Sequence, residues 1–138
     1  MKRMLGIDYG VARTGVAVTD PLGITAQGVA TIHSGNTERV LQEVLNYAKQ
    51  YEVDTIVVGL PKNMNNTMGE RGEACIAFGE LLKQHIDCEV VMWDERLSTV
   101  SAIGFLNETN TRGAKRKAVV DTVAATIILQ NYLDFKKG

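Results

Sequence analysis

Three acidic residues stand at points of the sequence where side chains of different elements can meet. Asp8 is the last residue of a short apolar segment and lies between Gly6 and Gly10. Glu95 follows Asp94 at the end of a second apolar segment. Asp121 lies inside AVVDTVAATIILQNYL, which is typical of a mostly buried helix. Because ligands bind beyond the carboxyl ends of parallel strands, two strand ends and a helix margin can bring Asp8, Glu95 and Asp121 into one cleft.

Such a group of carboxylates is suited to metal-assisted hydrolysis. Like charges held together raise one another's pKa unless a cation neutralises them, and Mg²⁺ and Mn²⁺ prefer hard oxygen ligands. Two such ions about 4 Å apart would activate a water and stabilise the leaving oxygen of a phosphodiester. We therefore predict a two-ion Mg²⁺ or Mn²⁺ site in a nuclease, since no Ser-His-Asp or Cys-His arrangement is evident.

Each acid also has an ordinary structural interpretation. Asp8 can be a turn residue, Glu95 can pair with Arg96, and Asp121 can be an acid favoured by a helix N-terminus. Adjacent strand residues point to opposite faces, so either Asp94 or Glu95 can be the ligand, and we favour Glu95. The expectation of a site rests on all three acids falling where one cleft would form.

A phosphodiester substrate also needs cations near the acids. The run 112–117 precedes the helix of Asp121, where cations oppose the helix dipole, which favours a role in phosphate contact. Arg13 and Arg96 stand beside the acids and can instead pair with them. The polar segment 61–72 is long for a connection and is expected to flank the cleft. The candidate substrate-binding residues are Arg13, Lys62, Asn63, Arg71, Arg96, Lys115, Arg116 and Lys117.

Hydrophobic patterning predicts the elements that position these residues. Alternating or continuous apolar runs predict strands, and apolar residues at helical spacing predict helices. Expected strands are Met4–Asp8, Thr14–Asp20, Ile24–Ile32, Thr55–Gly59 and Glu89–Trp93. Expected helices are one capped by Asn36 or Thr37, one from a capping box at Thr67–Glu70, one near 98–106 and one near 115–133. The order βββαβαβαα predicts an α/β fold with a mixed five-stranded sheet, antiparallel at first and then parallel.

The last predicted helix is strongly apolar, and its core-facing side has to be chosen from spacing alone. We expect Val120, Val123, Ala124 and Ile127 to face the core, with Asp121 on the margin of that stripe.

Length and composition set the class of protein. With 138 residues, 45% of them hydrophobic, the chain is expected to be a single domain, 1–138. No apolar stretch is long enough for a membrane span and no leader is evident, so a cytoplasmic protein is expected. Cys75 and Cys88 are expected to be buried reduced thiols, and His33 and His85 to lie at the surface. A net charge of -1 argues against binding of nucleic acid by bulk charge alone, and it leaves room for a local basic face.

Four segments resemble the YqgF/RuvX family of ribonuclease H-like proteins: GIDYGVARTGVAVTD, VVGLPKNMNNTMGERG, DERLSTVSA and KAVVDTVAATIILQNYL. The resemblance implies a ribonuclease H-like fold and a metal-binding triad of Asp8, Glu95 and Asp121. It further implies processing of the 5′ end of pre-16S rRNA, or resolution of Holliday junctions in branched DNA, and we favour RNA. Asn66 and Met68 depart from a glycine and an acid that are common in the family.

Two other classes of function remain open from the sequence. The segment GIDYG also looks like the phosphate-binding turn of actin-like ATPases and sugar kinases, but those proteins place nucleotide between two domains. A nucleic-acid-binding module without catalysis is the other alternative. Symmetric junction cleavage would require a dimer, and no segment reads as a dimer face, so a monomer or weak homodimer is expected.

Overall fold

The computed structural model describes residues 3–61, 69–94 and 113–137, and in the last range the side chains of residues 122–136. The expected helix near 98–106 therefore lies outside the described residues. Within them, no helix combines the length and the apolar character that a membrane crossing requires.

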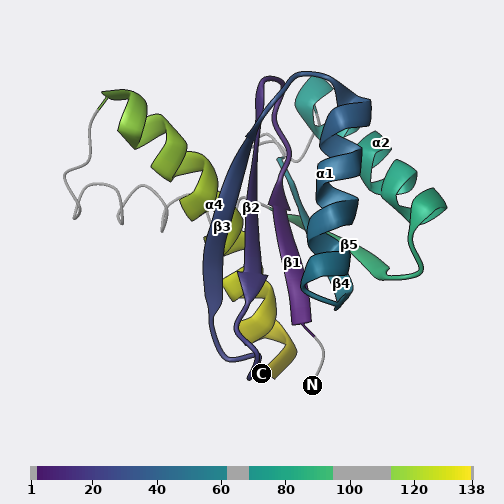
Figure 1. The fold of residues 1–138 in the computed structure, drawn as a ribbon, viewed down its shortest axis with the longest axis vertical. Helices are drawn as coiled ribbons and strands as arrows, with labels where there is room; N and C mark the ends of the chain where they lie inside the picture. The colour runs from purple at the N-terminus through teal and green to yellow at the C-terminus, as the bar shows by residue number, and fades with distance from the viewer. Residues whose placement is uncertain (1–2, 62–68, 95–112, 138) are drawn as a thin grey trace.

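A mixed five-stranded sheet forms the centre of the molecule (Figure 1). Its strands lie in the order β3-β2-β1-β4-β5, with β1–β2 and β2–β3 antiparallel and β1–β4 and β4–β5 parallel. The predicted antiparallel meander followed by parallel strands is confirmed. The bounds are β1 Arg3–Asp8, β2 Arg13–Thr19, β3 Ala26–His33, β4 Val53–Leu60 and β5 Glu89–Asp94.

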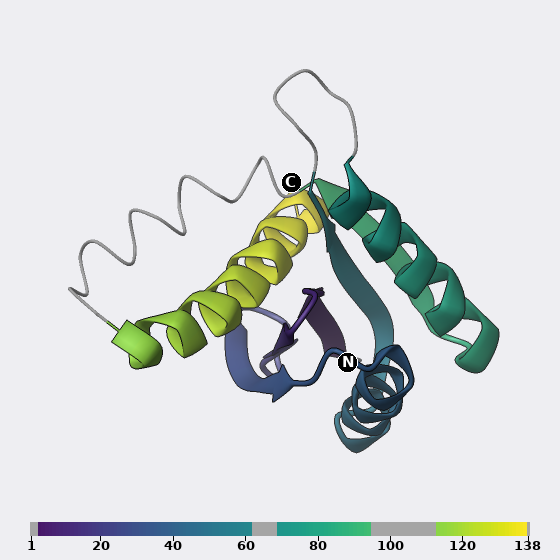
Figure 2. The ribbon, with the colours of Figure 1, turned by 90° about the horizontal axis from the view of Figure 1, so that it is seen from above.

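Helices cover both faces of this sheet. Figure 2 shows α1 and α2 on one side and α4 on the other. The bounds are α1 Thr37–Gln50, α2 Glu70–His85 and α4 Gly113–Lys137. Asn36 caps α1 as predicted, because its side chain accepts a hydrogen bond from the Arg39 N–H at 3.0 Å.

The expected capping box of α2 is wrong. The helix begins at Glu70 behind Gly69, which makes no side-chain cap, so it starts later than a cap at Thr67 would place it. Glu70 and Glu73 lie in the first turn, where negative charge stabilises a helix N-terminus. Acidic side chains at this end therefore take the place of the expected cap.

Small residues allow α4 to cross close to the sheet. Gly6, Ala17 and Gly28 are cross-strand neighbours on β1, β2 and β3, and they lie on the face that α4 covers. A Cβ at Gly6 would stand 2.8 Å from the Leu129 Cβ, and one at Gly28 would overlap the methyl group of Thr122. The row of small side chains thus forms the surface on which α4 lies.

The buried side of α4 differs from the expected one. Ala125, Ile128, Leu129 and Tyr132 are buried against the sheet, whereas Val123, Ala124 and Ile127 are only half-buried. The predicted stripe is therefore wrong. Because this helix carries apolar residues on nearly all sides, its spacing does not single out one face; contact with Gly6 does so in the fold.

The cysteines and histidines follow the sequence-based expectations in part. Cys75, a residue of α2, is buried as expected, whereas Cys88 is only half-buried, and neither forms a disulfide. His33 and His85 are exposed, and the His85 Nδ1 lies 3.0 Å from the Leu81 carbonyl oxygen.

Candidate active site

Asp8 ends β1 as a buried carboxylate. Its exposed fraction is 7%, and it is the one charged residue that is buried among the residues the structure describes. Strand alternation places Leu5 and Ile7 against α1 and α2, so Asp8 shares the α4 face with Gly6. A buried charge is costly unless it is paired, so this position calls for a cation.

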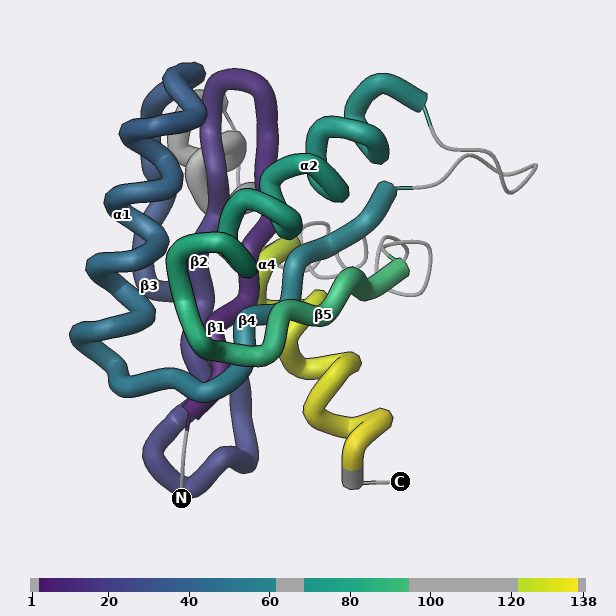
Figure 3. Tube along the Cα trace, turned by 90° about the vertical axis from the view of Figure 1, so that its right-hand side faces the viewer, coloured from purple at the N-terminus to yellow at the C-terminus, as the bar shows by residue number. Residues whose placement is uncertain are grey.

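Arg71 supplies one positive charge to this carboxylate. Its Nη2 donates to the Asp8 Oδ1 at 3.1 Å. Arg71 is the second residue of α2, which starts on the side of the molecule where β4 and β5 end (Figure 3). The predicted substrate-binding residue Arg71 is therefore in direct contact with the predicted catalytic residue Asp8.

The residue next to Asp8 is anchored to both helices of the opposite face. The Tyr9 ring stacks on Phe78 of α2 with 4.3 Å between centroids, and its hydroxyl lies 3.2 Å from the Thr37 Oγ1 of α1. The Cys75 thiol contacts the Tyr9 carbonyl oxygen at 3.7 Å. These contacts hold the end of β1 in place, which a positioned metal ligand requires.

The turn after Tyr9 is closed by glycine. A Cβ at Gly10 would overlap the Arg13 carbonyl oxygen, so no larger residue fits there. Arg13 begins β2 at the same edge of the sheet and is half-buried. The tight turn thus brings a second candidate cation to the edge at which β1 ends.

Asp94 ends β5 on the opposite face from Asp8. Val90 and Met92 pack in the core beneath α2, whereas Val91 and Trp93 pack in the core beneath α4. Alternation therefore assigns Asp94 to the α2 face. Its cross-strand neighbour is Leu60 of β4, so Asp94 is two strands from β1, about 9–10 Å at the usual strand spacing.

The backbone of α4 passes over the sheet near Asp8. Asp8 pairs with Gly15 on β2, and Gly15 pairs with Thr31 on β3. The Thr31 hydroxyl lies 3.1 Å from that of Thr122, the residue after Asp121. The helix at position 121 is therefore tied to the row of residues that contains Asp8, while the side chain of Asp121 lies outside the described residues.

The remaining predicted site residues are not described. Lys62, Asn63, Glu95 and Arg96 lie outside the described residues, and Lys115, Arg116 and Lys117 are described only as backbone positions in the first turns of α4. No group of three metal-binding side chains occurs within the described part of the chain, which contains Asp8 and Asp94 but neither Glu95 nor the Asp121 carboxylate.

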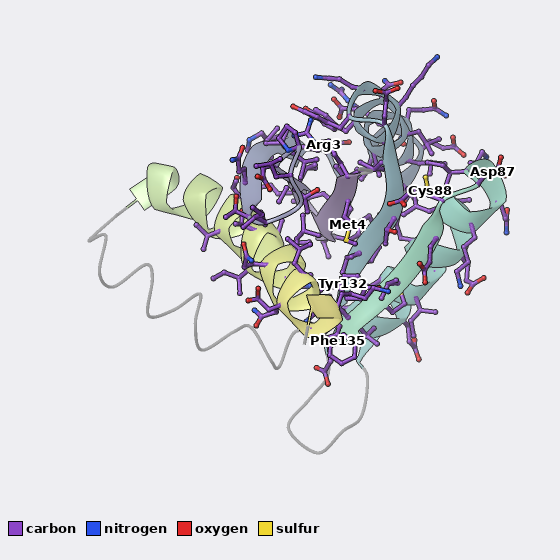
Figure 4. All side chains as sticks on the ribbon, turned by 90° about the horizontal axis from the view of Figure 1, so that it is seen from below. Arg3, Met4, Asp87, Cys88, Tyr132 and Phe135 are labelled. Atoms are coloured by element: carbon purple, nitrogen blue, oxygen red, sulfur yellow. The ribbon has the colours of Figure 1, made fainter. Side chains whose placement is uncertain are left out.

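Two features of this region were not anticipated. The contact between Arg71 and Asp8 joins residues 63 positions apart, and its sole sequence signal is an arginine in a first helical turn, against the dipole. Trp93 packs on Tyr132 and Phe135 of α4, at 5.6 and 5.4 Å between centroids, and Figure 4 shows Tyr132 and Phe135 near the end of α4. These rings fix the end of β5 against α4.

Comparison with known proteins decides the family. A family model, "RuvX: Holliday junction resolvase", matches residues 2–135. The chain belongs to the RuvX family. A protein of Clostridium novyi named "Putative pre-16S rRNA nuclease" is 52% identical over 96% of this chain and 98% of its own length. A Clostridium botulinum protein of the same name is 50% identical over 96% of both chains.

Solved structures with little sequence identity share the fold. RuvC of Thermus thermophilus, solved with a Holliday junction substrate, matches with a TM-score of 0.66 and 11% identity, over 100% of this chain and 98% of that one. The fowlpox virus Holliday junction resolvase matches with a TM-score of 0.57 and 14% identity, over 96% and 99%. Together with the RuvX relatives, these matches confirm the predicted family, the ribonuclease H-like fold and the nuclease class.

Proposed function

We propose that this RuvX-family nuclease is a cytoplasmic, divalent-metal-dependent enzyme that processes the 5′ end of pre-16S rRNA. The observation that carries the proposal is the buried carboxylate of Asp8, which sits at the end of β1 on the face that α4 covers. The substrate follows the names of the relatives that are 50% or more identical over nearly the whole chain.

Asp8, Glu95 and Asp121 are the proposed metal ligands and catalytic residues. Val91, Trp93 and Glu95 are alternate positions in the sequence, and Val91 and Trp93 pack on the α4 face. This alternation supports Glu95 rather than Asp94 as the partner of Asp8. Position 121 is four residues before the buried residue Ala125. At about 100° of rotation per residue, the two positions lie about 40° apart around the helix axis. This supports Asp121 as the third ligand.

The carboxylate chemistry suits Mg²⁺ or Mn²⁺. Carboxylate oxygens are among the ligands that these ions prefer, and the ions, two of them in this proposal, would supply an activated water and charge stabilisation at the leaving oxygen. Asp8 would hold its oxygen in a fixed place, because Tyr9 is anchored by Phe78 and Thr37. The cationic residues Arg13, Lys115, Arg116 and Lys117 would bind the phosphates on either side of the cut, with Lys62, Asn63 and Arg96 as further candidates.

Holliday junction resolution is the second candidate, because the family description names it and the RuvC structure contains such a junction. Symmetric cutting of a junction needs two coordinated sites in a dimer. The two candidates therefore differ in the oligomeric state of the active enzyme as well as in the nucleic acid that it cuts.

The test replaces Asp8 by Asn, which keeps the shape of the side chain and removes its charge. Asp87→Asn is the matched control, because Asp87 is exposed in the connection between α2 and β5. Each protein is incubated with Mg²⁺ or Mn²⁺ and one of three substrates: RNA spanning the 5′ end of 16S rRNA, unrelated single-stranded RNA, or a four-way DNA junction.

We expect the wild type and Asp87→Asn to cut the rRNA precursor, and Asp8→Asn to lose at least about 100-fold in kcat, as expected when a group that acts in the transition state is removed. Equal cutting by Asp8→Asn in a clean preparation would remove Asp8 from the mechanism. Preferential cutting of the junction by a dimer would replace rRNA by branched DNA as the substrate.

A further inference from the structure

The ion pair between Arg71 and Asp8 is unequal in its two partners. The Asp8 side chain is 10% exposed and is fixed at the end of a buried strand, whereas the Arg71 side chain is 52% exposed. Arg71 extends from the first turn of α2, directly after the segment that connects β4 to this helix. Of the two side chains, Arg71 is the one that can move without disturbing the sheet.

Local structure does not favour an arginine at this position. A cation in the first turn opposes the helix dipole, and the neighbouring acids Glu70 and Glu73 show which charge that end prefers. A surface ion pair by itself adds little stability. The feature that draws Arg71 here is the buried negative charge of Asp8, which needs positive charge nearby.

A divalent ion bound to Asp8 would remove the attraction that holds Arg71 beside this carboxylate. The ion brings two positive charges to the carboxylate that now accepts the Arg71 hydrogen bond, so it would repel the guanidinium. Arginine forms paired hydrogen bonds to phosphate with its planar fork of donors. A guanidinium released beside the metal site would lie where a substrate phosphate enters.

We propose that Arg71 is an exchanging counter-ion: it pairs with Asp8 when metal is absent and binds a phosphate of the nucleic acid once metal occupies the site. This inference rests on the proposed metal-dependent nuclease function and deepens it. It assigns to Arg71 a substrate contact that depends on prior metal binding, and it makes metal and guanidinium compete for one carboxylate.

The experiment compares Arg71→Gln and Arg71→Lys with the wild type. Arg39→Gln is the matched control, because Arg39 is also an exposed arginine in the first turn of a helix and pairs with an acid, Glu43, at 3.8 Å. Mn²⁺ binding is measured without nucleic acid, by calorimetry and by the paramagnetic resonance of free Mn²⁺. Steady-state cleavage then gives kcat and KM separately, and circular dichroism verifies that each variant is folded.

We expect Arg71→Gln to bind Mn²⁺ about 3- to 10-fold more tightly than the wild type, because a competing positive charge is gone. The same variant should show a KM raised about 10-fold or more, with kcat much less affected, as expected when a group that binds the substrate is removed. Arg71→Lys should keep a metal affinity near that of the wild type and recover part of the KM, and Arg39→Gln should change neither.

Unchanged or weaker Mn²⁺ binding by Arg71→Gln would overturn the proposal, because Arg71 would then merely hold Asp8 in place. An unchanged KM would also overturn it. Failure of the nuclease function itself looks different: the wild type would then bind no Mn²⁺, and Asp8→Asn would cut as well as the wild type.

Discussion

Single side chains near Asp8 show how the site depends on support from the opposite face of the sheet. The Tyr9 ring stacks on Phe78 and its hydroxyl reaches Thr37, so the residue after Asp8 is anchored in the core that α1 and α2 share. A carboxylate that must hold an ion loses its function when its backbone shifts by a fraction of an ångström.

The Tyr9 anchor can be tested by two substitutions. Tyr9→Ala should lower the free energy of unfolding by about 2 kcal/mol, less than the roughly 3–5 kcal/mol of a fully buried ring, because Tyr9 is only half-buried. Tyr9→Phe keeps the stack and should stay within about 1 kcal/mol of the wild type. Urea unfolding and cleavage assays should show stability and kcat falling in Tyr9→Ala and largely retained in Tyr9→Phe.

Asp20 gives the fold a pH-dependent contribution far from the site. The Thr25 and Ile24 N–H groups donate to its carboxylate at 2.9 and 2.7 Å, and these bonds lower the pKa of Asp20 below its usual value. A lowered pKa in the folded state stabilises the protein above the unfolded pKa of about 3.9, and this stabilisation disappears as pH falls through the folded pKa.

Asp20→Ala should therefore be less stable than the wild type at neutral pH, and the difference should shrink as the pH falls below the unfolded pKa of about 3.9 toward the lower pKa of the folded state. Asp20→Asn keeps an acceptor oxygen without the charge, so its difference from the wild type should be smaller at every pH. That difference should shrink over the same pH range, because the titrating carboxylate belongs to the wild type in both comparisons. Urea midpoints measured from pH 3 to pH 7 would reveal this pattern, and a constant gap for Asp20→Ala would contradict it.

Among the elements, the packing of α4 on β1 leaves no room for a side chain at Gly6. An added Cβ there would meet the Ala125 carbonyl oxygen at 2.9 Å, and a helix backbone cannot give way as a side chain can. At Gly79 of α2, the nearest atom to an added Cβ is the Met92 sulfur at 2.9 Å, which belongs to a flexible side chain.

Gly6→Ala should consequently destabilise the fold by about 1–3 kcal/mol, as overpacking does in cores. Gly79→Ala should stay within about 1 kcal/mol of the wild type, because the gain in helix propensity offsets the displacement of Met92. The measurement is thermal or urea unfolding of both variants. Equal destabilisation of the two would mean that α4 can move away from the sheet as easily as Met92 can rotate.

The elements also show which parts of the fold can be predicted from local sequence patterns. Strands β1 to β5 were predicted to within two residues at either end, because alternation and apolar runs are local signals that burial on a sheet face imposes. The core side of α4 was predicted wrongly, because its apolar residues surround the helix and Gly6, more than a hundred residues earlier, selects Ala125. The pairing of Arg71 with Asp8 is likewise non-local, so local spacing does not reveal it.

At the scale of the whole molecule, charge must be distributed unevenly, because a net charge of -1 gives no general attraction for nucleic acid. We expect the triple substitution of Lys115, Arg116 and Lys117 by Gln to weaken RNA binding. The slope of log K against log salt should fall by about 0.7 for each phosphate that the protein no longer neutralises.

The control for this prediction removes three lysines elsewhere, by substituting Gln for Lys49, Lys83 and Lys136, which are exposed on three different helices. Both triple variants have the same net charge, so a difference between them measures the location of charge and not its total. Titrations of RNA at several salt concentrations that gave equal slopes for both variants would contradict a phosphate-binding start of α4.

Helix α4 is the last element along the chain, yet it covers β1, β2 and β3, the first three to be made. During synthesis on the ribosome, one apolar face of the sheet therefore stays uncovered until residues 122–133 have been made and pack against it. Asp121 emerges with them, more than a hundred residues after Asp8, so in the proposed enzyme an unfinished chain has no complete set of metal ligands. If Asp121 is a metal ligand as proposed, a nascent chain that ends before residue 121 should therefore be unable to cleave RNA.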